Sequence, residues 1–306
     1  DEEMFSKEFK DALDEILFNP ANTILFRKYL GDPDRIVYEI DTSTPEKPSQ
    51  PRNTIKYNGS TSWRERIISD DFEVKAKEAK LFLLCSPHNP SGRAWSQEES
   101  EKIIDICLEH DVLIISDEIH ADIVFKRTHH SIGSFEKIMH HCVILNAPSK
   151  TFNVAGLNTS YAIIPDTRLR QAYRVEQDRS GISNGNPFGI EALISAYKEG
   201  APWLDQLKEY LGSNISYVNT FLKEHQLPIN AVPTEATFLM WLDCKEMGLS
   251  HAQLVDFFVH KAKLGLNDGK SFGEAGEGFM RLNVGTSKEV LKEAMQRLLD
   301  AYKAAY

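Results

Sequence analysis

An amide, a carboxylate and a primary amine stand in three separate polar turns of the sequence, at Asn89, Asp117 and Lys150. A buried lysine loses affinity for its proton, and the neutral amine can then attack a carbonyl carbon. A carboxylate at the same site could keep a pyridine nitrogen protonated, and an amide could donate to a phenolate oxygen. Together these groups match the needs of an enzyme that holds an aldehyde cofactor with a pyridine ring.

Each of these residues also has an ordinary structural explanation. Most lysines are solvated surface residues, and Asp117 with its neighbour Glu118 could cap a helix or form a surface pair. The position of all three residues favours a functional role over a structural one, because each follows a short apolar run that predicts a buried strand. Ligands of open α/β sheets bind outside the carboxyl ends of the strands. We therefore expect Asn89, Asp117 and Lys150 to converge on one site.

The elements that must position these residues are predicted in the middle of the chain. Short apolar runs and a helical pattern between about residues 80 and 165 indicate an α/β unit with a mostly parallel sheet and covering helices. Ser96 and Glu99 form a capping box that opens one of these helices. The expected strands are Leu81 to Cys85, Val112 to Ser116, His141 to Asn146 and Ser160 to Ile164.

The rest of the chain predicts a smaller α+β unit that follows two helices. Asn186 and Pro187 are typical of a helix start, and apolar residues from Trp203 to Leu222 mark a long amphipathic helix. The expected strands of the smaller unit are Thr237 to Leu242 and Gly278 to Val284, with helices opened by Ser250 and by a Thr286 to Glu289 capping box. We expect an N-terminal segment (1–60), a large cofactor-binding domain (61–185), and an interdomain helix with a small C-terminal domain (186–306).

Composition excludes several classes of function. The 45 acidic residues outnumber the 35 basic ones, and a net charge of −10 would repel a nucleic acid backbone. No apolar run is long enough to span a bilayer and the first ten residues are polar, so we expect a cytoplasmic protein with no membrane partner. The cysteines lack the spacing of a metal site, and we expect no metal and four buried thiols at Cys85, Cys107, Cys142 and Cys244.

Three motifs carry a resemblance to a known family. The segments Leu84 to Arg93, Ser116 to Asp122 and Ala147 to Asn153 resemble the pyridoxal phosphate (PLP)-dependent class I/II aminotransferase superfamily, fold type I. His120 stands where ordinary aminotransferases usually have a tyrosine, and in this the chain is similar to the cystathionine β-lyase branch, the bacterial carbon–sulfur lyases. The match runs from about Phe72 to the C terminus. It implies an α/β, three-layer PLP-transferase-like fold with a smaller α+β C-terminal domain.

The resemblance also implies a role for individual residues. Arg281, taken without the family, could be a structural ion pair, and His120 could be a packed or capping imidazole. The resemblance implies that Lys150 forms the Schiff base, Asp117 contacts the ring nitrogen and Asn89 contacts the ring hydroxyl. It also implies that Ser149 contacts the phosphate, that His120 makes a further cofactor contact, and that Arg281 binds the substrate α-carboxylate. A planar guanidinium suits the last role because it can form two parallel charge-assisted hydrogen bonds.

The implied reaction is a β-elimination that cleaves cystathionine or a related cysteine S-conjugate to a thiol, pyruvate and ammonia. PLP is the expected cofactor, an amino acid the expected small-molecule substrate, and a homodimer the expected assembly. Two alternatives stay open: a class I/II aminotransferase that uses the same lysine, and a catalytically impaired scaffold that serves as a binding or regulatory protein.

The N-terminal part departs from the family pattern. Relatives usually have a longer stretch before the motif matched by Asn89 and Pro90, and that stretch contains the phosphate-binding turn. The nearest Gly-Ser/Thr cluster here is residues 58–61, for which an ordinary turn is the competing interpretation. Three explanations stay open: the sequence omits segments of a longer protein, the chain is a short variant whose phosphate site is completed by a neighbouring subunit, or the chain is a scaffold that has lost catalysis.

Overall fold

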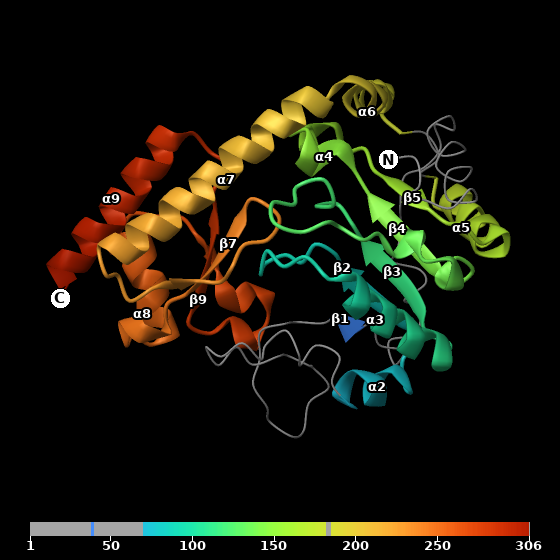
Figure 1. The fold of residues 1–306 in the computed structure, drawn as a ribbon, viewed down its shortest axis with the longest axis horizontal. Coiled ribbons are helices and arrows are strands. Elements are labelled where there is room, and N and C mark those ends of the chain that lie inside the picture. Colours follow the sequence, from blue (N-terminus) through green and yellow to red (C-terminus); the bar gives the residue numbers. More distant parts are fainter. Residues whose placement is uncertain (1–37, 40–69, 182–184, 306) are drawn as a thin grey trace.

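The computed structural model describes residues 38–39, 70–181 and 185–305 (Figure 1). Two sheets organise them, one built from the first half of the chain and one from the last third. The strands are β1 Tyr38–Glu39, β2 Leu81–Cys85, β3 Leu113–Asp117, β4 Cys142–Asn146, β5 Tyr161–Ile163, β6 Asn230–Ala231, β7 Leu239–Asp243, β8 Asn267–Asp268 and β9 Phe279–Asn283. All four strands expected for the large unit are present, with ends shifted by one residue at most.

Helices cover both sheets (Figure 1). Ser96 and Ser250 form the two capping boxes that open α3 and α8, and Asn186 caps α6 with Pro187 in its first turn. The α-helices are α2 Asp70–Ala76, α3 Gln97–Glu109, α4 Pro148–Thr151, α5 Thr167–Arg179, α6 Pro187–Glu199, α7 Ala201–Glu224, α8 His251–Asp256 and α9 Lys288–Ala305. Shorter turns are η2 Ile132–Ser134, η3 Glu136–Ile138, η4 Ala155–Leu157, η5 Lys245–Met247, the π-helical η6 Phe257–Lys261, η7 Gly269–Phe272 and η8 Glu274–Gly276.

The large sheet has the strand order β1-β2-β3-β4-β5. Strands β1 to β4 pair in parallel, and β5 pairs antiparallel to β4. Successive side chains of a strand point to opposite faces. Accordingly Phe82, Ile114 and Cys142 pack on the face covered by α3, and Ile115 and Val143 pack on the face covered by α5. The predicted three-layer α/β fold, in which a mostly parallel sheet is the middle layer, is confirmed.

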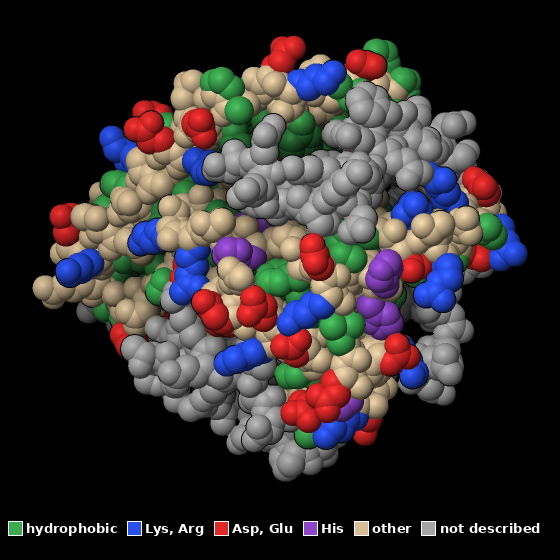
Figure 2. All heavy atoms as spheres, turned by 45° about the vertical axis from the view of Figure 1, so that its right-hand side comes forward, with side chains coloured by type: hydrophobic (Ala, Val, Ile, Leu, Met, Phe, Trp, Pro, Cys, Tyr) green, Lys and Arg blue, Asp and Glu red, His purple; other side chains and the backbone are tan. Residues whose placement is uncertain are grey.

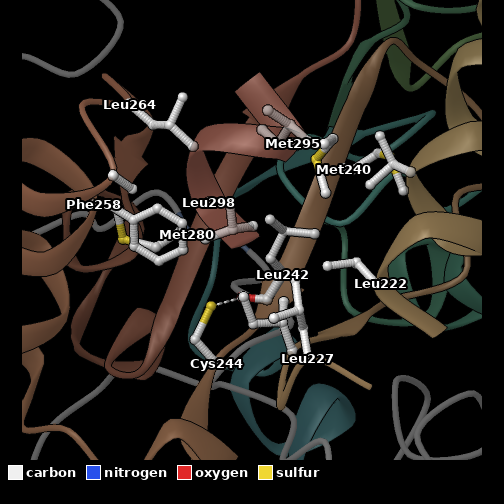
Figure 3. Close-up of a cluster of buried hydrophobic side chains, with 14 of the residues drawn as sticks. Leu222, Leu227, Met240, Leu242, Cys244, Phe258, Leu264, Met280, Met295 and Leu298 are labelled. Carbon is white, nitrogen blue, oxygen red and sulfur yellow. Dashed lines mark hydrogen bonds between the residues drawn. The ribbon is translucent and has the colours of Figure 1, made fainter. Parts of the chain in front are cut away.

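The small sheet is antiparallel, with the order β6-β7-β9-β8. Its main core lies against α7, η6 and α9, where Val218, Met240, Met280 and Met295 are at most 2% exposed. Figure 3 shows this cluster, with side chains from both strands and helices pointing toward one another. The opposite face carries a smaller cluster around Trp241. The smaller α+β unit expected from the sequence is therefore present.

One expected helix start is wrong by one residue. The sequence pattern placed the last capping box at Thr286 to Glu289, but α9 begins at Lys288 and the Ser287 hydroxyl accepts the backbone N–H of Val290 at 3.3 Å. The carbonyl oxygen of Thr286 instead accepts from the side chain of Asn214 at 3.0 Å. That contact holds Thr286 outside the helix, so the next hydroxyl residue caps it.

The surface carries mixed charge. Figure 2 shows acidic and basic side chains interspersed on the face turned to the viewer. Across the part of the chain that the structure describes, none of the helices combines the length and apolar character that a bilayer crossing requires. Three of the four cysteines are buried as expected, whereas Cys85 is only partly buried. The Gly-Ser/Thr cluster at residues 58–61 lies outside the described residues.

Candidate active site

The carboxyl ends of three neighbouring strands meet at one edge of the large sheet. In the register of the sheet Cys85 pairs with Asp117, and Asp117 pairs with Leu145. The backbone pairing continues for one residue, because the N–H of Ser86 donates to the Asp117 carbonyl at 2.9 Å and that of Glu118 to the Leu145 carbonyl at 2.8 Å. The turns that bear Asn89, Asp117 and Lys150 therefore leave the sheet side by side, as the sequence predicted.

Asp117 is the last residue of β3 and remains exposed to solvent. Desolvation by the surrounding protein raises the pKa of its carboxyl group, and the negative charge of Glu118 acts in the same direction. Two contacts act against this pKa rise: the Ile119 N–H, which donates to Oδ1 at 3.1 Å, and the positive charge of Lys150. Asp117 is thus available to a ligand that carries a cation.

Glu118, the next residue, points away from solvent. Its carboxylate accepts from the Ser116 hydroxyl and the Ile132 N–H, both at 2.9 Å, and lies 3.0 Å from Nε2 of His129. Glu118 is 2% exposed. The alternative interpretation of Asp117 and Glu118 as a surface pair is therefore wrong, since the two carboxylates face different environments and Glu118 anchors the loop that follows β3.

Lys150 lies in the short helix α4, three residues after the N-cap residue Ala147 and two residues after Pro148, which occupies the first helical position. Its side chain is half-buried. The next residue, Thr151, is fully buried, and its hydroxyl donates to Oδ2 of Asp122 at 2.7 Å. This hydrogen bond ties the helix that carries Lys150 to the loop after Asp117, so the amine is positioned by two adjacent strands of the sheet.

Asn89 lies in a tight turn after β2. The turn is closed by backbone hydrogen bonds of His88, whose N–H donates to Arg93 and whose carbonyl accepts from Gly92, both at 2.8 Å. Gly92 has φ +68°, and a Cβ there would lie 3.2 Å from the carbonyl oxygen of Ala236. The Gly92 carbonyl also accepts the N–H of Ala236 at 2.9 Å. The Asn89 turn is thereby attached to the segment that leads into β7 of the small sheet.

Arg281 of β9 reaches the same site from the small sheet. Its Nη1 donates to Oδ1 of Asn89 at 2.6 Å, and its Nη2 donates to Oδ1 of Asn267 at 2.9 Å. The guanidinium carbon lies 4.5 Å from the centroid of the Phe272 ring, a cation–π contact. Partial burial lowers the pKa of Arg281, but an arginine stays charged. Among the described residues both hydrogen-bond partners of the Arg281 side chain are neutral amides, so the structure does not show the alternative of a structural ion pair there.

His120 is buried between these groups and is 3% exposed. Desolvation, with the positive charges of Lys150 and Arg281, lowers the pKa of His120 to about 4. The ring contacts Phe238 edge-on at 5.7 Å, and within the described residues its Nδ1 has no hydrogen-bond partner. A neutral imidazole with an unpartnered nitrogen beside two cations is suited to hydrogen bonding a ligand.

The structure therefore brings five of the six predicted residues together: direct contact joins Asn89 to Arg281, and electrostatic interactions link Lys150 to Asp117 and His120. Ser149 precedes Lys150 and is half-buried, and its assignment to a phosphate stays a prediction. Sequence reasoning missed Asn267, Phe272 and Asp122. Asn267-Asp268-Gly269 carries only an ordinary turn signal, and its position opposite Arg281 depends on a strand register that the sequence pattern does not reveal.

Comparison with known proteins identifies what the chain is similar to. The family model for aminotransferase class I and II matches residues 57–298. Cystathionine beta-lyase PatB of Bacillus subtilis (strain 168) is 39% identical over 239 residues, which are 76% of this chain and 61% of PatB. The chain thus spans about three fifths of the length of this curated relative.

Two solved structures show the same architecture. A PLP-bound putative aminotransferase from Clostridium difficile 630 superimposes with a TM-score of 0.74 at 39% identity, over 76% of this chain and 60% of that one. Cystalysin from Treponema denticola, whose crystal structure contains pyridoxal 5′-phosphate, superimposes with a TM-score of 0.75 at 33% identity, over 77% of this chain and 61% of cystalysin.

Proposed function

Because the chain belongs to the aminotransferase class I and II family, we propose that it is a PLP-dependent carbon–sulfur β-lyase. The proposed substrates are cystathionine or related cysteine S-conjugates, which with water give a thiol, pyruvate and ammonia. The observation that carries the proposal is the meeting of Arg281 with Asn89 beside Asp117 and Lys150. The 39% identity to a cystathionine beta-lyase favours elimination over other reactions of the family.

The chemistry of the donor set fits the cofactor. Lys150 offers a primary amine to the aldehyde, Asp117 a carboxylate to the ring nitrogen, and Asn89 an amide to the ring oxygen. A protonated ring nitrogen would supply Asp117 with the compensating positive charge that a partly desolvated carboxylate lacks. His120 supplies a further uncharged polar atom at the same site, and Ser149 a hydroxyl for the phosphate.

When bound, pyridoxal phosphate supplies an acceptor for the electron pair left on Cα of the substrate. Arg281 binds the substrate α-carboxylate and so fixes where Cα lies relative to the large sheet. Lys150 provides the amine that takes the proton from Cα. Asp117 keeps the proton on the ring nitrogen during that transfer. The sulfur at Cβ then leaves as a thiolate, and addition of water to the remaining three-carbon fragment gives pyruvate and ammonia.

The aminotransferase alternative uses the same residues and is favoured by the name of the Clostridium difficile structure. The test is an assay of the full-length protein, loaded with PLP, on cystathionine without a keto acid. Equimolar pyruvate and thiol are the result expected of a lyase. Product that forms only when a keto acid is added would establish transamination instead. A protein that does not bind PLP would be the impaired scaffold, and both enzyme assignments would fail. The homodimer and the cytoplasmic location stay predictions.

A further inference from the structure

We propose that Asn267 is a positioning residue, which holds the guanidinium of Arg281 in the orientation that receives the substrate carboxylate. The inference deepens the proposed function and rests on it, because it assigns to Arg281 the carboxylate of an amino acid. Asn267 lies on β8, directly opposite Arg281 of β9 in the register of the small sheet. Its side-chain oxygen accepts from Nη2 of Arg281 at 2.9 Å.

Two amide oxygens, one from the turn after β2 and one from β8, accept hydrogen bonds from the two terminal nitrogens of the guanidinium. Asn89 accepts from Nη1 at 2.6 Å while Asn267 accepts from Nη2. The ring of Phe272 lies against the guanidinium, 4.5 Å from its central carbon. An arginine side chain has many rotamers in solution, and restricting it before a ligand binds reduces the entropy lost on binding. Of the three side chains that contact the guanidinium, Asn267 is the one on β8, the strand next to β9.

Neutral partners leave the guanidinium able to bind an anion. A guanidinium has five N–H donors, and the two asparagines need only one each. Among the described residues the Nε–H group of Arg281 has no hydrogen-bond partner although it is buried. Donors therefore remain for a carboxylate, and the positive charge is not cancelled by an acidic partner. An aspartate at position 267 would keep the acceptor oxygen but would compete with the substrate for the charge.

Asn267 is itself held in place by its neighbour. Oδ1 of Asp268 accepts the Lys270 N–H at 2.7 Å and lies 2.6 Å from Nε2 of His251. Nδ1 of His251 accepts the N–H of Gly278 at 3.0 Å, so Nε2 carries the ring proton and donates it to Asp268. Gly278 directly precedes β9. The His251–Asp268 pair thus locks the two-residue strand β8 beside the strand that carries Arg281.

The Asn267 side chain is exposed, so its removal should leave the fold intact. This separates a role in positioning from a role in stability. In the full-length, PLP-loaded protein, N267A should raise KM for the sulfur substrate about 3- to 10-fold with kcat changed less than about twofold, as expected for the loss of one hydrogen bond of ordinary net strength. N267D should raise KM further. N230A, which removes an exposed asparagine side chain from β6 of the same sheet, is the matched control and should behave as wild type.

A binding measurement separates the carboxylate from the rest of the ligand. Ethylamine is L-alanine with the carboxylate replaced by hydrogen, and neither compound has a leaving group at Cβ. Calorimetric titration of the loaded protein should show that N267A weakens L-alanine about 3- to 10-fold and leaves ethylamine unchanged.

Two results would overturn the inference while the proposed function stands: N267A that binds L-alanine as wild type does, or N267A that weakens both ligands equally. If wild-type protein loaded with PLP neither binds L-alanine nor cleaves the sulfur substrate, the proposed function fails and the inference fails with it.

Discussion

Arg281 of β9 and Asn89 of the turn after β2 stand 192 positions apart in the sequence, yet Nη1 of the arginine donates to Oδ1 of the asparagine at 2.6 Å. The contact places the group that we assign to the substrate carboxylate beside the group that we assign to the cofactor ring. Its geometry depends on how the sheets are joined. Two backbone hydrogen bonds connect the segment after β3 to the segment before β7. The N–H of Phe125 donates to the Glu235 carbonyl at 2.9 Å, and the N–H of Thr237 donates to the Ile123 carbonyl at 2.8 Å.

Replacing Arg281 by lysine tests the carboxylate clamp. A lysine keeps the positive charge but has no planar fork, so it cannot bind the carboxylate and both asparagines in one geometry. R281K should raise KM for the sulfur substrate about 10- to 100-fold. Steady-state kinetics of R281K and of R297K, which alters an exposed arginine of α9, provide the measurement and its control. An unchanged KM in R281K would show that Arg281 does not bind the substrate carboxylate.

Replacing Asp117 by asparagine should separate activity from stability. The loss of the anion beside the ring nitrogen should lower kcat about 10- to 100-fold, or ~1.4–2.7 kcal/mol of barrier. The folded-state pKa of Asp117 is raised, so its ionised form opposes folding at pH 7 and this cost disappears once the group is protonated.

The cofactor-free D117N protein should therefore melt at a higher temperature than wild type at pH 7, and the two should approach each other near pH 4. D105N, at an exposed position of α3, is the control for both measurements. Equal kcat in D117N and wild type would contradict the role assigned to Asp117.

His120 should contribute to acid sensitivity. Its folded-state pKa of about 4 is depressed from 6.5, so the folded protein favours the neutral ring. The stabilisation is present above pH 6.5 and is lost as the pH falls toward 4. Over that interval wild type should lose up to about 3 kcal/mol more unfolding free energy than H120F. Urea unfolding of the cofactor-free proteins at pH 7 and pH 4.5 measures this, and parallel losses in the two proteins would show that His120 is not the titrating group.

Much of the fold could be predicted because local signals and packing agree. The strands of the large sheet are short apolar runs, and the helix starts at Ser96, Asn186 and Ser250 have side chains that satisfy the first backbone N–H groups. The cap at α9 was misplaced because Thr286 and Ser287 both have a hydroxyl group. Only the contact of Asn214 with the Thr286 carbonyl decides between them.

The hydrogen bond between Thr151 and Asp122 should help to hold Lys150 in place. T151V removes the donor while keeping the shape of the side chain, and should cost about 1–2 kcal/mol of unfolding free energy because the Asp122 carboxylate loses a partner. It should also weaken PLP retention. T151S keeps the hydroxyl and should restore both properties. The readouts are urea unfolding and equilibrium dialysis of PLP, and a T151V protein with wild-type PLP affinity would rule out the second effect.

The site was predicted more completely within the large sheet than across the two sheets. Asn89, Asp117 and Lys150 follow strands that are adjacent and parallel, so one rule about strand ends predicts their convergence. Asn267 belongs to a strand of two residues, too short for any hydrophobic period to identify. Its pairing with Arg281 follows from packing of the small sheet, which the local sequence does not encode.

The central claim is that the amine of Lys150 forms the covalent bond to pyridoxal phosphate. The most direct test is reduction of the PLP-loaded, full-length protein with borohydride, followed by peptide mapping by mass spectrometry. The phosphopyridoxyl group should be found on the peptide that contains Lys150, and K150A should lack both this label and the visible absorbance of the bound cofactor. A label on another lysine, or a K150A protein that keeps the absorbance, would contradict the claim.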